Sequence, residues 1–177
     1  MHRSSLVSFL WLVMAAGVDV RAAADDACVG FKWDVAKEHA LFGETARVLS
    51  AGADLKSAQV LLPQHLYEVR LLPQSTVAFA AAPGKTTPAE GSYAGVAALK
   101  IDAAGDYRIS VNLPVWIDVA ADGKLATVED FQGLHNCDAP RKIVQFDLRG
   151  AKQFILQVSG SEQPTIRLTV TKAPPKT

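Results

Sequence analysis

Alternation of apolar and polar side chains is clearest between residues 105 and 124, which read GDYRISVNLPVWIDVAADGK. Tyr107, Ile109 and Val111 fall on every second position, so they share one face of a strand and the polar residues between them share the other. The alternation resumes after Pro114, which cannot donate a ladder hydrogen bond, and ends at an Asp-Gly turn. The pattern predicts two strands of an antiparallel sheet that has one face on the core and one in water.

The same alternation recurs along the rest of the chain. It predicts strands at residues 66–71, 93–101, 144–148, 154–158 and 166–170, and a short continuation at 77–79. Roughly eight strands separated by turns favour an all-β sandwich or barrel. The expected fold class is therefore mainly β, an antiparallel and jelly-roll-like β-sandwich. Residues 127–140 are predicted to be the longest irregular segment in the second half.

A short helix is predicted before the first strand. Asp34 is a good N-cap, and Val35, His39 and Phe42 follow it at helical spacing. The helix is expected at residues 35–42 and ends at Gly43. In residues 44–64 neither the helical nor the strand period prevails, although residues 46–49 are compatible with a strand or with a continuation of the helix.

The first 24 residues are typical of a secretory signal peptide. Arg3 gives a positive start, residues 6–18 are apolar but too short to span a bilayer, and Ala22 to Ala24 provide a cleavage site. We expect residues 1–24 to be removed, residues 25–172 to form one domain, and residues 173–177 to be a disordered tail. The mature protein is expected to be periplasmic or secreted, with no membrane insertion after signal cleavage.

Charge excludes some partners. The full chain has 18 basic and 18 acidic residues, and removal of Arg3, Arg21 and Asp19 with the signal peptide leaves 16 and 17. No basic cluster is present that would attract a phosphate backbone, so no nucleic-acid partner is expected.

Two cysteines remain in the mature chain, Cys28 and Cys137. In an oxidising compartment two cysteines usually form one disulfide, which here would join the start of the domain to a distant loop. A free thiol, or metal binding by Cys137 together with His135, is the alternative.

Motifs for common chemistries are missing from the sequence. It contains no GxxxxGK[ST], no GxGxxG and no GxSxG. A cupin-type non-haem iron dioxygenase would use two histidines and a carboxylate, usually with an HxH motif that this chain lacks. His135 with Glu129, Asp130 or Asp138 supplies the candidate metal ligands in the same loop. No cofactor is expected in the leading interpretation.

Residues 105–171 resemble the bacterial pre-peptidase C-terminal type of β-sandwich. The segments that carry the resemblance are GDYRISV, PVWIDVAADGK, FDLRGAKQFILQVSG and TIRLTV. In that family such modules are secreted accessory jelly-roll domains, often appended to enzymes. The resemblance implies a role in binding or maturation.

The leading functional hypothesis is an exported β-sandwich of accessory or binding type, with a glycan, an envelope component or a protein as its partner. The candidate ligand-binding residues are Trp116, Phe131, His135 and Asp138, because loops on a rigid scaffold carry function more often than cores. The alternatives are a metal-dependent jelly-roll enzyme and a purely structural envelope protein. An exposed aromatic patch would favour binding, and convergence of His135 with carboxylates in a pocket would favour the enzyme.

Overall fold

The fold comes from a computed structural model that describes residues 28, 30–85, 89–150 and 153–175. The expected signal peptide, residues 1–24, lies outside the described residues. Within them, no helix is both long enough and apolar enough to cross a membrane.

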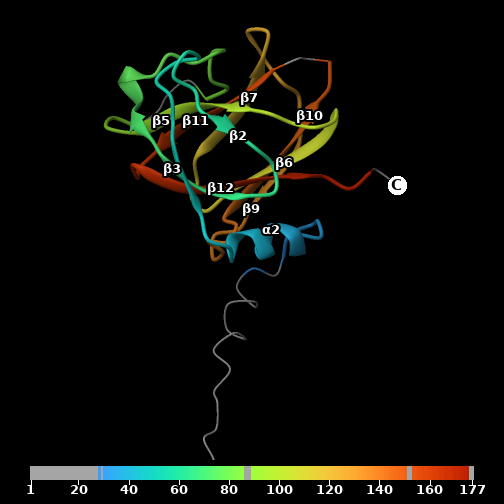
Figure 1. The fold of residues 1–177 in the computed structure, drawn as a ribbon. Coiled ribbons are helices and arrows are strands. Elements are labelled where there is room, and N and C mark those ends of the chain that lie inside the picture. Colours follow the sequence, from blue (N-terminus) through green and yellow to red (C-terminus); the bar gives the residue numbers. More distant parts are fainter. Residues whose placement is uncertain (1–27, 29, 86–88, 151–152, 176–177) are drawn as a thin grey trace, which may run out of the picture.

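The described residues form two six-stranded sheets that lie face to face, with one short helix beneath (Figure 1). Sheet A has the order β1 (Arg47–Ser50), β3 (Leu66–Arg70), β12 (Thr165–Lys172), β6 (Gly105–Val111), β10 (Lys142–Leu148) and β9 (Val128–Gly133). Sheet B has the order β2 (Val60–Leu61), β5 (Tyr93–Leu99), β11 (Phe154–Ser161), β7 (Trp116–Ala121) and β8 (Lys124–Leu125), and β4 (Leu72–Pro73) also pairs with β5. The expected mainly β, sandwich-like class is confirmed.

The core lies between the sheets and is built from the alternating positions. Tyr107, Ile109 and Val111 of β6 all point into it and are no more than 2% exposed. Val119 of β7 and Leu156 of β11 meet them from the opposite sheet. Every one of these side chains is placed by the period of two that the sequence shows.

The outer face of sheet A is covered, whereas the sequence predicted a wet face. Helix α2 (Ala36–Phe42) packs across β12, and Arg108 and Ser110 on the outer face of β6 are buried beneath the N-terminal segment. The prediction was wrong because alternation reports which residues share a face but not what covers it. Arg108 and Thr171 on this face have hydrogen-bond partners in the covering segment, Asp34 and Glu38.

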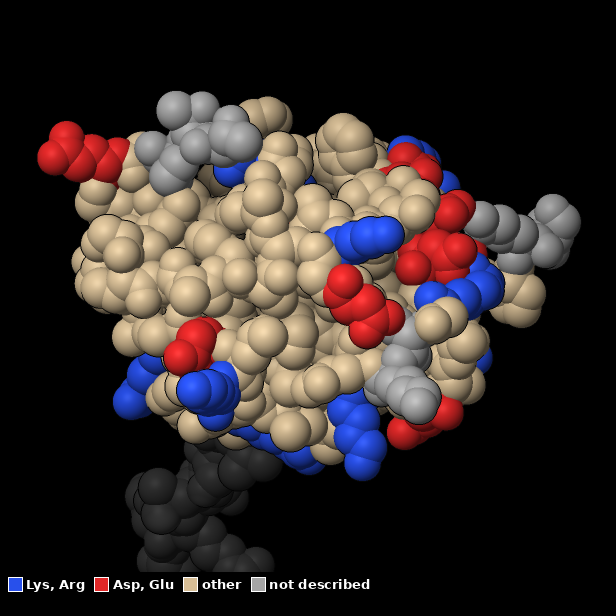
Figure 2. Space-filling view, turned by 90° about the horizontal axis from the view of Figure 1, so that it is seen from above, with Lys and Arg blue, Asp and Glu red and all other residues tan. Residues whose placement is uncertain are grey.

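The outer face of sheet B is also covered, by two alanine-rich loops. Val77 and Phe79 pack with Val96, Ala120 and Ile155 on this outer face. These two residues were expected in a strand, but the 3-10 helix Gln74–Thr76 precedes them and they lie in irregular chain. Figure 2 views the molecule from this side and shows a broad uncharged area, with Lys, Arg, Asp and Glu mainly toward its margins.

The segment without a readable period contributes two short strands. β1 pairs with β3 and β2 pairs with β5, and both pairs are parallel, so the sheets are mixed rather than wholly antiparallel. The chain between β1 and β2 packs tightly against β5 and against itself. A Cβ on Gly95 of β5 would lie 2.3 Å from Cβ of Ala51, and a Cβ on Gly52 would lie 2.6 Å from the amide nitrogen of Ala58 in the same segment. Only glycine fits at such contacts.

Three further expectations concern boundaries. The helix begins at Ala36, one residue later than predicted, and Asp34 Oδ1 accepts a hydrogen bond from the Ala36 N–H at 3.0 Å. Residues 128–133 form strand β9 instead of the irregular chain that was predicted. Ala173, in the expected tail, is buried and donates its N–H to the Asp106 carbonyl, while residues 176–177 lie outside the described part.

Candidate functional site

Phe131 is the most exposed large apolar side chain among the described residues, at 64%. It lies on β9, which ends the strand order of sheet A. Phe131 is opposite Val144 and Val128 is opposite Phe146, and both partners point into the core. Opposed residues of antiparallel strands share a face, so Phe131 and Val128 lie on the core side of the sheet, beyond the rim of the core. They form an apolar surface, the β9 surface, in which Val128 is 46% exposed.

The backbone edge of β9 is partly closed by a side chain of the same strand. The Phe131 N–H donates to Asp130 Oδ1 at 2.8 Å, and Lys32 Nζ binds the same oxygen at 2.5 Å. The hydrogen bond from Lys32 lowers the pKa of Asp130, so the carboxylate stays ionised over the neutral range. A charged group at an edge strand hinders the addition of another strand.

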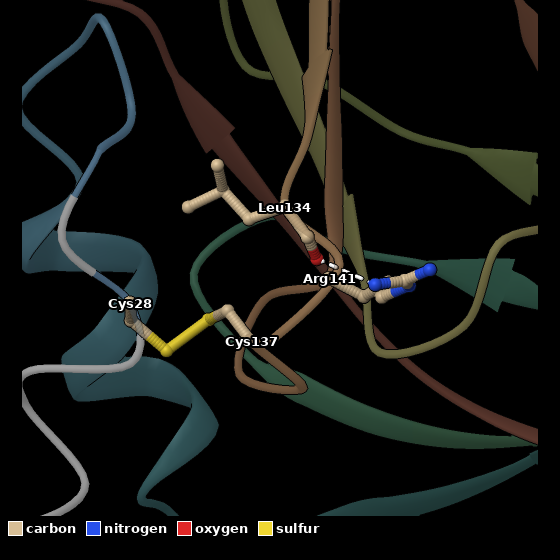
Figure 3. The surroundings of a disulfide bond; sticks show 4 residues. All are labelled: Cys28, Leu134, Cys137 and Arg141. Carbon is tan, nitrogen blue, oxygen red and sulfur yellow. Dashed lines mark hydrogen bonds between the residues drawn. A yellow bond between two sulfur atoms is a disulfide. The ribbon is translucent and has the colours of Figure 1, made fainter.

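The loop after β9 is tied to the N-terminal segment. Cys28 and Cys137 form the predicted disulfide, and the Arg141 guanidinium donates to the Leu134 carbonyl at 2.7 Å in the same loop (Figure 3). His135 is exposed, and its Nδ1 lies 3.1 Å from Nη2 of Arg141. Asp138 is also exposed. His135 and Asp138 are therefore exposed to solvent in a loop that the disulfide ties to the N-terminal segment.

The candidate metal ligands are not brought together. Within the described part of the chain, no three His, Cys, Asp or Glu side chains are grouped so that they could hold a metal ion. Asp130 is engaged with Lys32, and His135 with Arg141. Cys137 is in the disulfide, which removes it as a thiolate ligand. The geometry gives no support to a site built from His135, Glu129 and Asp130.

Trp116 lies at the start of β7 and is 37% exposed. Its indole N–H donates to Asp118 Oδ1 at 3.1 Å, and the other carboxylate oxygen accepts from the Gly84 N–H at 3.0 Å. Lys142 Nζ lies 5.1 Å from the indole ring centroid and donates to the Val115 carbonyl at 2.9 Å. The indole N–H and the ring of Trp116 therefore already have partners within the protein, Asp118 and Lys142.

A buried polar layer between helix α2 and sheet A was not anticipated. Thr171 donates to Glu38 at 2.5 Å, and Arg108 lies 3.8 Å from the same Glu38 oxygen. Arg108 also donates to the Asp34 carbonyl at 2.9 Å and lies 5.0 Å from the Trp33 ring centroid. No local motif marks this layer, since its members come from segments more than 60 residues apart.

Two hollows lie where the β5–β6 and β10–β11 connections meet, and sequence reasoning missed both. One has a volume of about 560 Å³ and is lined by Lys100, Ile101, Asp102 and Phe154, among others. The other has a volume of about 730 Å³, and Ala104 lines both. Volumes of this size suit small molecules.

Comparison with models of known protein families and with curated proteins finds no match. The resemblance of residues 105–171 to pre-peptidase C-terminal modules stays an expectation. What the geometry offers is an exposed apolar surface on a rigid strand, a disulfide-held loop and two hollows. These features are suited to contact and binding.

Proposed function

We propose that this chain is an exported β-sandwich of accessory type that binds a protein partner through the β9 surface. The observation that carries the proposal is the 64% exposure of Phe131. Exposed apolar patches often mark interaction sites, and Phe131 lies with Val128 on the same side of β9. The candidate residue Phe131 becomes the anchor, and Val128 extends the contact.

The strand makes Phe131 a suitable anchor because little order has to be lost when it binds. β9 pairs with β10 from Lys142 to Phe146, so the backbone beneath Phe131 is already held. Aromatic residues dominate the energetics of protein interfaces when they enter a pocket on the partner. A preorganised aromatic side chain adds to this by reducing the ordering cost.

The contact is made by side chains rather than by strand addition. Asp130 already occupies the Phe131 N–H, and Lys32 holds Asp130 in place. A partner strand would have to displace this charged pair. Trp116 is a poorer platform for a glycan than sequence indicated, because Lys142 lies near its ring and Asp118 binds its N–H.

Export to the periplasm or to the exterior fits the disulfide. Bonds such as Cys28–Cys137 persist in oxidising compartments and are rare in the cytosol. The predicted signal peptide supports export, and the likeness to secreted accessory modules supports both export and an accessory role.

The test is site-specific photo-crosslinking with benzoylphenylalanine in the cells that produce the protein. Phe131→benzoylphenylalanine is expected to give a discrete crosslinked protein. Val48→benzoylphenylalanine is the matched control, because Val48 is 59% exposed on β1 at the opposite edge of sheet A. Phe131→Ser should abolish co-purification of the crosslinked partner and change the unfolding free energy by less than about 0.5 kcal/mol.

Equal crosslinking at positions 131 and 48, or none at 131, would contradict the proposal. A loss of stability above about 1 kcal/mol in Phe131→Ser would instead make Phe131 a structural residue.

A further inference from the structure

The larger hollow brings together cationic side chains from three separate elements. Lys37 comes from helix α2, Lys172 from the end of β12, and Arg149 from the turn after β10. Apart from Asp106, which is paired with Arg149, the rest of the lining is small or apolar and consists of Ala104, Gly105, Ala173, Pro174 and Pro175. Such a lining, apolar with a few convergent charged groups, is typical of small-molecule sites.

The three cations differ in how they are held. Arg149 Nη1 lies 2.7 Å from Asp106 Oδ1 and 2.5 Å from Asp147 Oδ1, so its guanidinium is fixed. Lys37 and Lys172 are exposed, and neither ammonium has a hydrogen bond or ion pair with any residue that the structure describes. Two cations thus remain available to a ligand beside one that is already paired.

Lys172 packs closely against Gly105, where the absence of a side chain leaves room for the lysine stem. A Cβ on Gly105 would lie 3.2 Å from Cε and 3.8 Å from Nζ of Lys172. The lysine stem therefore lies across Gly105. The next residue, Ala173, is held by its hydrogen bond to the Asp106 carbonyl at 2.8 Å. The C-terminal wall of the hollow is consequently anchored to its floor.

We propose that this hollow is a binding site for a small molecule that carries an oxyanion, a carboxylate or a phosphate, on an apolar body. Lys37 and Lys172 bind the oxyanion. Arg149 contributes to the positive field, although Asp106 and Asp147 offset much of its charge. The volume of about 730 Å³ accommodates the apolar body against Ala104, Ala173 and the two prolines. This site is separate from the β9 surface and does not depend on the proposed function.

The test is an NMR titration of the ¹⁵N-labelled mature protein with benzoate, phenyl phosphate and the uncharged benzamide. Benzoate or phenyl phosphate is expected to shift the amide signals of Gly105, Asp106 and Ala173 in a saturable way. The relative affinities of benzoate and phenyl phosphate show whether the site prefers a carboxylate or a phosphate. Benzamide should leave these signals unsaturated, because it lacks the charge that the lysines recognise.

Charge-removing variants locate the site. Lys37→Gln with Lys172→Gln should weaken binding of the preferred anion by at least roughly tenfold. The control pair is Lys56→Gln with Lys124→Gln, which removes the same charge from exposed positions away from the hollow and should leave affinity unchanged. All four lysines are exposed, so both double variants keep the fold.

Three results would overturn the proposal. They are the absence of saturable shifts with both anions, binding of benzamide as tight as that of benzoate, and an equal loss of affinity in the control pair. Phe131→Ser should bind the anion normally, so failure here is distinct from failure of the partner proposal.

Discussion

Lys142 shows how one side chain can carry an electrostatic cost inside this fold. It is the first residue of β10, and its Nζ reaches the Val115 carbonyl and the Trp116 ring. Burial lowers its pKa, Asp118 acts in the opposite direction, and Lys85 adds to the lowering. The charged form is therefore less stable in the folded protein than in the unfolded chain.

The sign of the resulting pH dependence can be worked out. Between the lowered folded-state pKa and the ordinary value of 10.5, the unfolded chain binds more protons at this lysine. Stability contributed by Lys142 therefore rises with pH through that window. We expect Lys142→Met to remove this rise, so that the unfolding free energy of the wild type increases relative to that of the variant as pH increases.

Urea unfolding between neutral pH and about pH 10 measures this difference. Lys124→Met, at the exposed hairpin between β7 and β8, serves as the control and should follow the wild-type curve. Parallel curves for wild type and Lys142→Met would refute the expectation.

Single residues also show where sequence reasoning reached its limit. Phe131 could be chosen as a candidate because an aromatic residue in a polar segment stands out. Lys37, Arg149 and Lys172 could not be grouped, since they are far apart in the chain and each resembles an ordinary surface cation. Their convergence depends on how α2, β10 and β12 pack.

At the scale of elements, the contact between α2 and sheet A is largely polar. Glu38 of the helix is buried and binds Thr171 of β12. Next to this pair, the hydroxyls of Ser110 and Thr169 are buried on adjacent strands without a hydrogen-bond partner among the described residues. The same interface thus contains both satisfied and unsatisfied hydroxyl groups.

Thr169 and Thr171 offer a matched comparison. Thr169→Val removes an unpaired hydroxyl at constant shape and should raise the unfolding free energy by about 1 kcal/mol. Thr171→Val removes a hydrogen bond to a carboxylate and should lower it by about 1.5–3 kcal/mol. Chemical denaturation of both variants measures the pair, and the same sign for both would contradict this account of the interface.

Elements were predictable where their own residues decide the matter. In β6, β7, β10, β11 and β12 every second residue is apolar and faces the core, because one side of each strand packs into it. β9 was missed because it is an edge strand with mostly exposed or half-buried residues and a bulge near Gln145, so its residues show no such period. For a similar reason β1 was left undecided between strand and helix and β2 was missed, since each strand places only one residue in the core.

For the whole molecule, the disulfide joins the N-terminal segment to the loop after β9. Cys28 and Cys137 are 109 residues apart, so the bond closes most of the domain into one loop. In the chain-entropy model a loop of about 100 residues contributes about 4.7 kcal/mol. The bond also holds residues 30–33 against β9, where Gln132 binds the Gly30 carbonyl and the Lys32 amide.

We expect Cys28→Ser with Cys137→Ser to lower the unfolding free energy by about 2–5 kcal/mol. The double variant avoids leaving a buried free thiol at position 137. Urea denaturation of the oxidised wild type and the double variant tests this value. A change below about 1 kcal/mol would mean that the N-terminal segment is held by its hydrogen bonds alone.

The sequence by itself determined the mainly β class, the core-facing side of the regular strands and the approximate position of the helix, and it favoured pairing of the two cysteines. These features follow from local periodicity and from residue chemistry. Only the tertiary structure decided that α2 covers sheet A, that β1 and β2 pair in parallel, and that β9 leaves Phe131 exposed. It also brought Lys37, Arg149 and Lys172 to one hollow. Such outcomes depend on contacts between distant segments, which no local pattern of side chains records.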